Sequence, residues 1–425
     1  MCRGAQSRCN RHEVATRSTR GLTPLISAGS PFFNFQWDIL LLESTFMAIF
    51  MAPRQWLPRR PGARPALPGG IWLTRCLLFK LMFLSGIVKL LSGDATWFEL
   101  TALDFHYETQ PLPTWTAWYA HHLPAWFQKL SVALMFVIEL VLPFLIFAPR
   151  RLRHLAAAGL VLLQVLIAAT GNYNFFNLLT MALCLPLLDD RLLERAIPRK
   201  WRERAVMKSG GSPSRIARAV GVSVLVVVLF ISALTFAREM ERSRHPQRIT
   251  GAPAAMLDFL DSALLSWGDP YLLRFVGPLR TINGYGLFRV MTTKRPEIVI
   301  EASLDGETWQ PYEVRWKPGD VERRPRFVAP HQPRLDWQMW FAALDIRRAG
   351  WIEGLLARRF EGSEPVLALF DRVPFEGRRP TYLRLVMYEY HFTTPEQRSA
   401  SGAWWRRTRM RATGVIRAPA PGRGN

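Results

Sequence analysis

Long apolar segments separated by short polar loops dominate the first half of the chain. About 20 apolar residues cover the hydrocarbon core of a bilayer, so each such segment predicts a membrane-spanning helix. The clearest segments are residues 71–92, 126–148, 155–170, 175–188 and 218–237. With a sixth apolar segment at residues 32–52, the pattern predicts about five or six spans.

The segment at residues 32–52 differs from the others because it contains Asp38 and Glu43. Charges at span depth are costly. An intramembrane polar site would explain them. We favour instead a helix packed against other helices, or a re-entrant or interfacial helix.

The charges of the loops predict which side of the membrane each loop faces. Residues 53–70 contain four arginines and no acid, and residues 189–217 form a second basic linker. Residues 93–125 contain four acidic residues and no Lys or Arg. Cytoplasmic loops carry the excess of Lys and Arg, so residues 93–125 are predicted to form an extracytoplasmic cap. The basic tail at residues 1–31 lacks an apolar period and is expected to be disordered.

The region after the last span, residues 238–425, is long enough for a packed domain. Residues 297–316 alternate apolar and polar positions around Asp305-Gly306, which predicts a β-hairpin. Residues 381–392 predict another strand, and residues 336–345 and 351–360 predict short helices. The fold class is therefore a multi-pass α-helical membrane domain, residues 32–237, followed by a β-rich α+β extracytoplasmic domain, residues 238–425.

Composition changes this picture little. The chain has 55 Lys and Arg against 33 Asp and Glu, a net charge of +22. A basic patch can bind nucleic acid, but here the basic stretches alternate with apolar segments, which favours cytoplasmic loops beside anionic lipid. The four cysteines form no C-x-x-C pair, which argues against thiol–disulfide catalysis. No G-x-S-x-G, P-loop, G-x-G-x-x-G or H-E-x-x-H motif occurs, and we predict no catalytic residue, cofactor or metal.

Polar residues of the cap form the first candidate site. Asp104, His106 and Glu108 occupy alternate positions, so on a strand they would share one face and could ligate a metal. We favour the alternative, three hydrogen-bonding residues of a polar cap. His121 and His122 precede a span and are expected at the membrane interface.

The second candidate lies in the stretch HQPRLDWQMWF, residues 331–341. Arg334 and Asp336 could form a buried ion pair, and Trp337 and Trp340 could belong to the core of the domain or to an aromatic surface that binds client proteins. We favour the core, because clustered Trp residues are common there. In residues 171–177, three asparagines could line a polar pocket, but they more often satisfy backbone groups at helix ends.

Several stretches together resemble the lipase maturation factor family, in family order over residues 32–392. They are FQWDILLLE (35–43), SGDATWFELTALDFHYETQPLP (92–113), GNYNFFNLLT (171–180), YGLF (285–288) and KPGDVERRPRFVAPHQPRLDWQMWFAAL (317–344). The resemblance implies a polytopic membrane protein with a lumenal C-terminal domain, which assists the folding of secreted proteins such as lipases without catalysing a reaction. Its partners would be membrane lipid and client proteins, not nucleic acid.

A second resemblance keeps an enzyme as the alternative. The helical part is distantly similar to the transmembrane family that includes the vitamin K-dependent carboxylase. The charged residues of the apolar segments would then build a site for a lipid or quinone: Asp38, Glu43, Lys80, Lys89 and Glu139. The expected location is the endoplasmic reticulum membrane in a eukaryote, or the inner membrane with the C-terminal domain in the periplasm in a bacterium.

Overall fold

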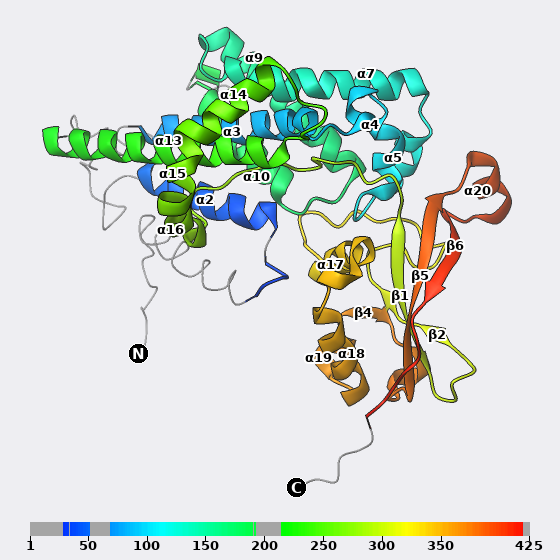
Figure 1. Ribbon diagram of the computed structural model, residues 1–425. Helices are drawn as coiled ribbons and strands as arrows, with labels where there is room; N and C mark the ends of the chain where they lie inside the picture. Colours follow the sequence, from blue (N-terminus) through cyan, green and yellow to red (C-terminus); the bar gives the residue numbers. More distant parts are fainter. Residues whose placement is uncertain (1–28, 34, 52–68, 190, 193–213, 420–425) are drawn as a thin grey trace, which may run out of the picture. The chain divides into compact units, whose positions relative to one another are not determined.

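The computed structural model describes residues 29–33, 35–51, 69–189, 191–192 and 214–419 (Figure 1). The expectations for the tail, for the basic loop 53–70 and for the linker 189–217 lie wholly or largely outside this part of the chain. Contacts divide the chain into two compact units. The helical unit comprises Met1–Leu100, Leu130–Val165 and Phe176–Val290, and the mixed unit comprises Thr101–Lys129, Leu166–Phe175 and Met291–Asn425.

Within the described residues, four helical stretches are long and apolar enough to cross a membrane. They are α3 (Gly70–Leu91), the run of α7 (Ala125–Phe136), η1 (Val137–Val141) and α8 (Leu142–Leu145), then α9 (Arg150–Thr170) and α13 (Arg215–Ser243). These confirm four of the predicted spans. The predicted span at 175–188 is a shorter apolar helix, α10 (Phe176–Leu183) with η2 (Leu185–Leu187), and the segment at 32–52 contains the 16-residue helix α2 (Gln36–Met51).

Helix α3 lies at the centre of the helical unit. In its apolar stretch 61% is buried inside the protein, compared with 22–28% for the other three spans. It runs parallel to α13: the rings of Phe83 and Phe236 are 5.8 Å apart, and the Leu91 carbonyl accepts a hydrogen bond from the His245 amide at 2.8 Å. The short helix α4 (Ala95–Phe98) follows α3.

The residues after α13 continue the helical unit. They form α14 (Ala252–Leu260), η3 (Asp261–Leu265), α15 (Ser266–Gly268), η4 (Asp269–Leu273), α16 (Arg274–Val276) and η5 (Gly277–Leu279). Leu257, Leu265 and Leu273 are buried on one side of this helical chain, which crosses α13 obliquely in Figure 1. Residues 238–290 therefore pack with the helices, although the sequence pattern groups them with the C-terminal domain.

An antiparallel sheet organises the mixed unit. Its strand order is β2 (Gln310–Pro311), β1 (Pro296–Ser303), β5 (Tyr382–Phe392) and β6 (Trp405–Ala412), and β7 (Ile416–Arg417) also pairs with β5. The short strands β3 (Glu313–Val314) and β4 (Phe370–Arg372) form a second, two-stranded sheet. The predicted hairpin is confirmed, with Gly306 at a φ of 85° in its turn, and so is the predicted strand at residues 381–392.

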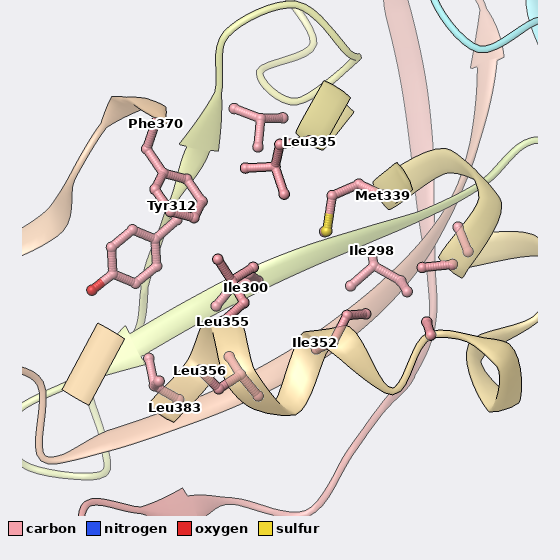
Figure 2. Packing of buried hydrophobic residues seen from close by; sticks show 14 of the residues in the cluster. Ile298, Ile300, Tyr312, Leu335, Met339, Ile352, Leu355, Leu356, Phe370 and Leu383 are labelled. Carbon is pink, nitrogen blue, oxygen red and sulfur yellow. The ribbon is translucent and has the colours of Figure 1, made fainter. Parts of the chain in front are cut away.

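Helices cover one face of this sheet. They are α17 (Arg334–Leu344), η6 (Ile346–Arg348), α18 (Trp351–Glu361), α19 (Glu364–Leu367) and η7 (Pro374–Gly377); α17 and α18 confirm the two predicted helices. Helix α20 (Pro395–Ser401) lies instead beside the cap, where Arg398 stacks on Trp118 and Trp404. Alternate residues of β1 and β5 face α17 and α18, because strand side chains alternate in direction. Figure 2 shows the resulting core, in which Ile298, Ile300 and Leu383 meet Met339 and Leu355.

The cap covers part of the opposite face. Helices α5 (Ala102–Thr109) and α6 (Trp115–His121) contribute Tyr107 and Trp118 to a second buried cluster. The other members come from β5 and β6 and include Tyr390, Phe392 and Trp405. Most of the predicted cap therefore packs as part of the mixed unit, together with the turn at residues 166–175.

Candidate functional site

The three cap residues lie on helix α5 and not on a strand, so they do not share the single face that the metal alternative required. On helix α5, alternate positions point about 200° apart, and the three side chains find separate partners. The Glu108 carboxylate accepts hydrogen bonds from the Phe392 amide at 3.0 Å and from His391 Nδ1 at 3.1 Å, while His106 Nε2 lies 3.2 Å from the Tyr173 hydroxyl. Asp104 is half-buried. No group of three or more His, Cys, Asp or Glu in the described residues could hold a metal ion.

The histidine pair at the end of α6 is part of the packing. His122 Nδ1 lies 2.7 Å from the Trp118 carbonyl oxygen, and the His121 ring contacts the Phe392 ring with centroids 5.6 Å apart. Burial lowers the pKa of His121 below its ordinary value. The His121 ring therefore helps to hold α6 on the sheet, whereas His122 contacts its own helix.

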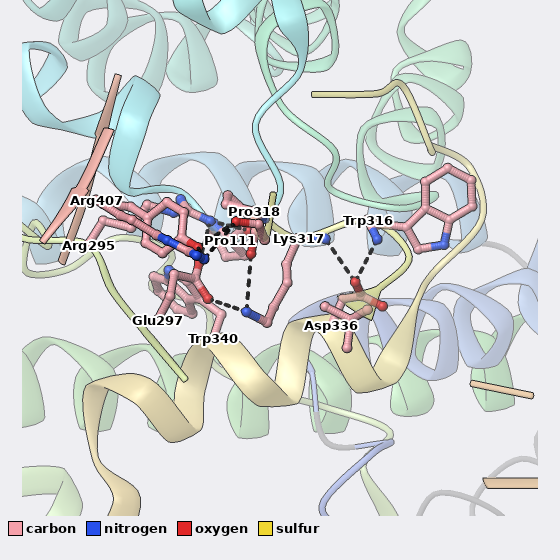
Figure 3. Close-up of polar contacts among 12 residues, drawn as sticks. Pro111, Arg295, Glu297, Trp316, Lys317, Pro318, Asp336, Trp340 and Arg407 are labelled. Atoms are coloured by element: carbon pink, nitrogen blue, oxygen red, sulfur yellow. Dashed lines mark hydrogen bonds and ion pairs between the residues drawn. The ribbon is translucent and has the colours of Figure 1, made fainter. Parts of the chain in front are cut away.

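Asp336 on α17 is buried, but its hydrogen-bond partners differ from the expected ion pair with Arg334. Asp336 Oδ1 accepts hydrogen bonds from the backbone amides of Trp316 and Lys317, both at 2.8 Å, rather than from Arg334 (Figure 3). Burial raises the pKa of Asp336, although the two amides and the Lys317 charge oppose this. Arg334 itself is half-buried.

Both tryptophans of α17 lie inside the mixed unit, where Trp337 is 4% and Trp340 6% exposed. The Trp340 indole donates a hydrogen bond to the Thr109 carbonyl at 3.0 Å. The Trp337 ring packs against Tyr173, with centroids 6.1 Å apart. Neither indole is available at a surface in this structure, which agrees with the favoured core interpretation.

These contacts bring the two candidate groups together. Thr109 directly follows Glu108 and meets Trp340, and Tyr173 lies between His106 and Trp337. The cap, the turn after α9 and helix α17 thus form one buried contact region, which we call the cap junction. From sequence alone, the two candidates had no visible connection.

Sequence reasoning missed the charged centre of the cap junction, which consists of Arg295, Glu297 and Lys317 (Figure 3). Arg295 donates to the carbonyl oxygens of Glu108 at 2.6 Å and Pro111 at 2.9 Å, and to that of Gln110. Glu297 forms ion pairs at 2.8 Å with both Arg295 and Lys317. All three side chains are at most 3% exposed.

Glu297 is buried, although the alternation of polar and apolar residues along β1 predicts that it faces solvent. It lies on the opposite face of β1 from Ile298 and Ile300, the face that alternation assigns to solvent. The cap covers that face, and Arg295 compensates the carboxylate. Burial lowers the pKa of Arg295, while attraction to Glu297 raises it in part.

The three asparagines of residues 171–177 have different partners. Asn174 donates to the Gln332 side chain at 2.7 Å, Asn177 donates to Gln164, and Asn172 bonds to backbone groups of distant loops. Asn172 Nδ2 donates to the carbonyls of Leu112 at 3.0 Å and Arg326 at 2.8 Å. Its Oδ1 accepts from the amides of Val328 at 2.7 Å and Ala329 at 3.1 Å. One side chain therefore fixes the loop before α17 to the cap.

The charged residues of the apolar segments form ion pairs in the helical unit. Lys80 Nζ lies 2.6 Å from Glu43, and Lys89 Nζ lies 2.6 Å from Glu139. Asp38 accepts a hydrogen bond from the Phe35 amide at 3.3 Å, near the start of α2. Each buried carboxylate thus has a structural partner, so nothing in these contacts supports the enzyme alternative.

Four apolar helices, two buried intramembrane ion pairs and a sheet held to a helical cap define a multi-pass membrane protein with an α+β unit. Two family descriptions match the chain. Lipase maturation factor transmembrane domain matches residues 22–195, and lipase maturation factor C-terminal domain matches residues 281–414. The chain belongs to the lipase maturation factor family.

Individual relatives agree with this assignment. Lipase maturation factor 2 of Homo sapiens is 39% identical over 468 residues, covering 89% of this chain and 65% of the relative. The Mus musculus protein of the same name is 37% identical, with 89% and 66% covered. Lipase maturation factor 1 of Mus musculus is 32% identical, with 91% and 67% covered. The chain thus spans about two thirds of the length of these relatives, and no solved structure matches it.

Proposed function

We propose that this protein is a membrane-bound maturation factor that assists the folding of secreted client proteins such as lipases, without catalysing a reaction. The observation that carries the proposal is the match to both parts of the lipase maturation factor family, in family order. In the cap junction, the carboxylates of Glu108, Glu297 and Asp336 are engaged with backbone amides or with side chains of the same unit. That suits a rigid scaffold better than an enzyme site.

The mixed unit would face the compartment in which clients fold. The basic loops before α3 and α13 predict that both helices begin at the cytoplasmic side, so the chain after α13 emerges on the other side. In a eukaryotic cell, the mixed unit would then lie in the lumen of the endoplasmic reticulum. The relatives compared above are vertebrate proteins, and they give no support to a bacterial location.

Strand β6 offers a surface for clients. It ends the strand path of the sheet, and its residues from Arg406 to Ala412 are all exposed. Arg406, Arg409 and Arg411 make it strongly basic, and next to it lies a groove of about 300 Å³, lined by apolar residues such as Leu385 and Met387. An extended client segment with acidic and apolar residues would fit, because an edge strand can pair with an added strand.

The test of the function removes the gene from its own host and measures exported proteins. We expect selective loss of the amount and activity of a few secreted proteins, with their mRNA unchanged and with rescue by the wild-type chain. An unchanged set of exported proteins together with an altered lipid or quinone profile would contradict the proposal and favour an enzyme.

The test of the surface uses charge reversal in the same host. Arg409→Glu combined with Arg411→Glu should abolish rescue, because both changes oppose an acidic client segment. The matched control is Arg347→Glu with Arg348→Glu, whose side chains are 89% and 90% exposed on η6 of the same unit. Equal rescue by both double variants, at equal protein levels, would exclude β6 while leaving the maturation role intact.

A further inference from the structure

Helices α3 and α13 provide markers of depth in the membrane, because they run parallel and both cross it. At the inner end, a Cβ on Gly69 would lie 3.2 Å from Leu225. At the outer end, the His245 amide donates to Leu91. Lys80 precedes Leu91 by 11 residues in α3, which is roughly 16 Å along a helix. Lys80 therefore marks the middle of a hydrocarbon core about 30 Å thick.

The helical chain that begins at α14 starts at the outer end. Arg244, next to His245, forms an ion pair with Asp258 of α14 at 2.5 Å. The same outer level is reached again after η5. Arg289 pairs with Glu239 near the outer end of α13 at 2.8 Å, and a Cβ on Gly286 would lie 3.3 Å from Val88 of α3.

Between these two points, the chain lies at mid-depth. Trp267 stacks on Phe230 of α13, with ring centroids 5.9 Å apart and planes at 19°. Gly268 approaches Leu234 so closely that a Cβ there would lie 2.9 Å from it. Further along, the Asn283 amide at 2.9 Å and the Tyr285 hydroxyl at 2.7 Å donate to Glu43, the partner of Lys80.

We propose that residues 252–285 form a re-entrant segment, which enters the membrane from the extracytoplasmic side, reaches its centre and returns to the same side. A stripe of aromatic side chains on this segment faces lipid acyl chains. The extracytoplasmic part of the chain then begins near residue 290 and not at residue 238.

The polar contacts of the loop support this depth. Non-helical backbone is tolerated inside a membrane only where protein covers it and satisfies its polar groups. Ile282, Asn283 and Tyr285 are 5%, 9% and 0% exposed. Glu43 Oε1 accepts a hydrogen bond from Lys80, and Glu43 Oε2 accepts hydrogen bonds from Asn283 and Tyr285 of the loop. The ion pair in α2 and α3 therefore serves as the anchor of the returning loop.

The opposite side of the segment is exposed and apolar. Its large side chains lie about four residues apart over most of its length: Phe259, Trp267, Tyr271, Phe275 and Leu279, with exposures of 67%, 43%, 80%, 77% and 51%. Patches of this kind mark contact surfaces. Because Trp267 stacks on Phe230, which is itself 42% exposed on the span α13, the stripe continues a surface that lipid already covers.

Two of the three aspartates of the segment have ion-pair partners, and Asp261 lies one helical turn beyond Asp258. Asp258 and Asp269 pair with Arg244 and with Arg238, the latter at 3.1 Å. Arg274 is exposed at depth, where a long side chain can extend its guanidinium toward the headgroups.

The test uses single cysteines in a chain whose four native cysteines are replaced. Tyr271→Cys and Phe275→Cys are compared with Leu162→Cys, which is 54% exposed on α9, and with Glu307→Cys in the exposed hairpin turn. A membrane-impermeant maleimide should label the first three at least tenfold more slowly than Glu307→Cys. Labelling of positions 271 and 275 as fast as position 307 would overturn the proposal and indicate an aqueous, client-facing stripe.

Two further measurements locate the segment. A bimane at position 271 or 275 should be quenched more by spin label at mid-chain of the lipid than at the headgroup; the reverse order would show an interfacial helix. Cysteines at Arg248 and Thr293, which flank the segment, should react only from the extracytoplasmic side of sealed vesicles. Reaction from opposite sides would show a complete crossing and would also overturn the proposal.

Discussion

The buried carboxylate of Asp336 permits two substitutions with opposite expectations. Both hydrogen bonds that it accepts, from the amides of Trp316 and Lys317, end on the same atom, Oδ1. Asp336→Asn keeps an oxygen at that position and removes the charge. Asp336→Ala removes the acceptor and leaves two amides without it.

The expected magnitudes follow from these contacts. A buried donor that loses its acceptor costs roughly 1–3 kcal/mol, so two donors should lower the free energy of unfolding by about 2–6 kcal/mol in Asp336→Ala. Since about 1.4 kcal/mol corresponds to a factor of ten, amide exchange in α17 should accelerate roughly 30-fold to 20,000-fold. Asp336→Asn should stay within about 1 kcal/mol of wild type, because its oxygen preserves both bonds.

The pH dependence has a defined sign. Burial raises the pKa of Asp336 in the folded protein above the ordinary value of 3.8. The folded protein therefore binds this proton more tightly than the unfolded chain does. The stabilisation that this proton provides is present below pH 3.8 and is lost as the pH rises through the raised value. Wild type should thus lose stability relative to Asp336→Asn as the pH increases.

The assay is hydrogen–deuterium exchange of α17 peptides in the full-length protein, in lipid nanodiscs at several pH values, corrected for intrinsic exchange rates. Equal protection in Asp336→Ala and Asp336→Asn would refute the argument, because it would mean that the two amides do not depend on Oδ1. A wild type that gains stability over Asp336→Asn with rising pH would refute the stated direction of the pKa shift.

Three further predictions test other buried polar groups. Arg359 is 1% exposed and its guanidinium lies 4.7 Å from the Tyr312 ring, without a carboxylate in an ion pair with it among the described residues. Arg359→Met should therefore raise the free energy of unfolding by about 1–3 kcal/mol, whereas the exposed Arg358→Met should not; a lower free energy of unfolding in Arg359→Met would contradict this. Asn172→Ala should destabilise the loop before α17 by about 2–4 kcal/mol, which faster amide hydrogen exchange in residues 326–332 would detect. Unchanged exchange there would argue against the four hydrogen bonds of the Asn172 side chain. Lys89→Met should reduce the fraction of protein that stays monodisperse on heating in detergent, because it leaves the Glu139 carboxylate buried without its ion-pair partner at a cost of about 3–5 kcal/mol. Adding Glu139→Leu should restore that fraction, and a double variant as unstable as the single one would count against the pairing.

The spans and most strands could be predicted from sequence because they depend on local periodicity. An apolar run such as 71–92 fixes a helix whatever surrounds it, and the alternation in 297–316 with the Asp305-Gly306 turn fixes a hairpin. The alternation of the three polar cap residues could not decide between a strand and a helix, because three residues are too short a signal.

The cap junction could not be predicted because its contacts join residues far apart in the chain. Glu297 looks like a solvent-facing strand residue until the cap that covers it is known. Asp336 has the expected burial but bonds to backbone amides, which carry no sequence signal. The sequence pattern also does not separate residues 238–290 from the C-terminal domain, because their apolar positions are interrupted by Asp258, Asp261 and Asp269.

The mixed unit is assembled from three separate pieces of chain, two of which lie between membrane spans. The Trp340 indole meets a carbonyl 231 positions earlier, and Phe392 meets Glu108 across 284 positions. During synthesis, the cap and the turn after α9 are therefore made long before the strands that bury Tyr107 and Trp118. Contacts between such distant residues form slowly. Because its three pieces have to meet on one side of the membrane, this unit can close only when the spans between them are inserted with matching sidedness.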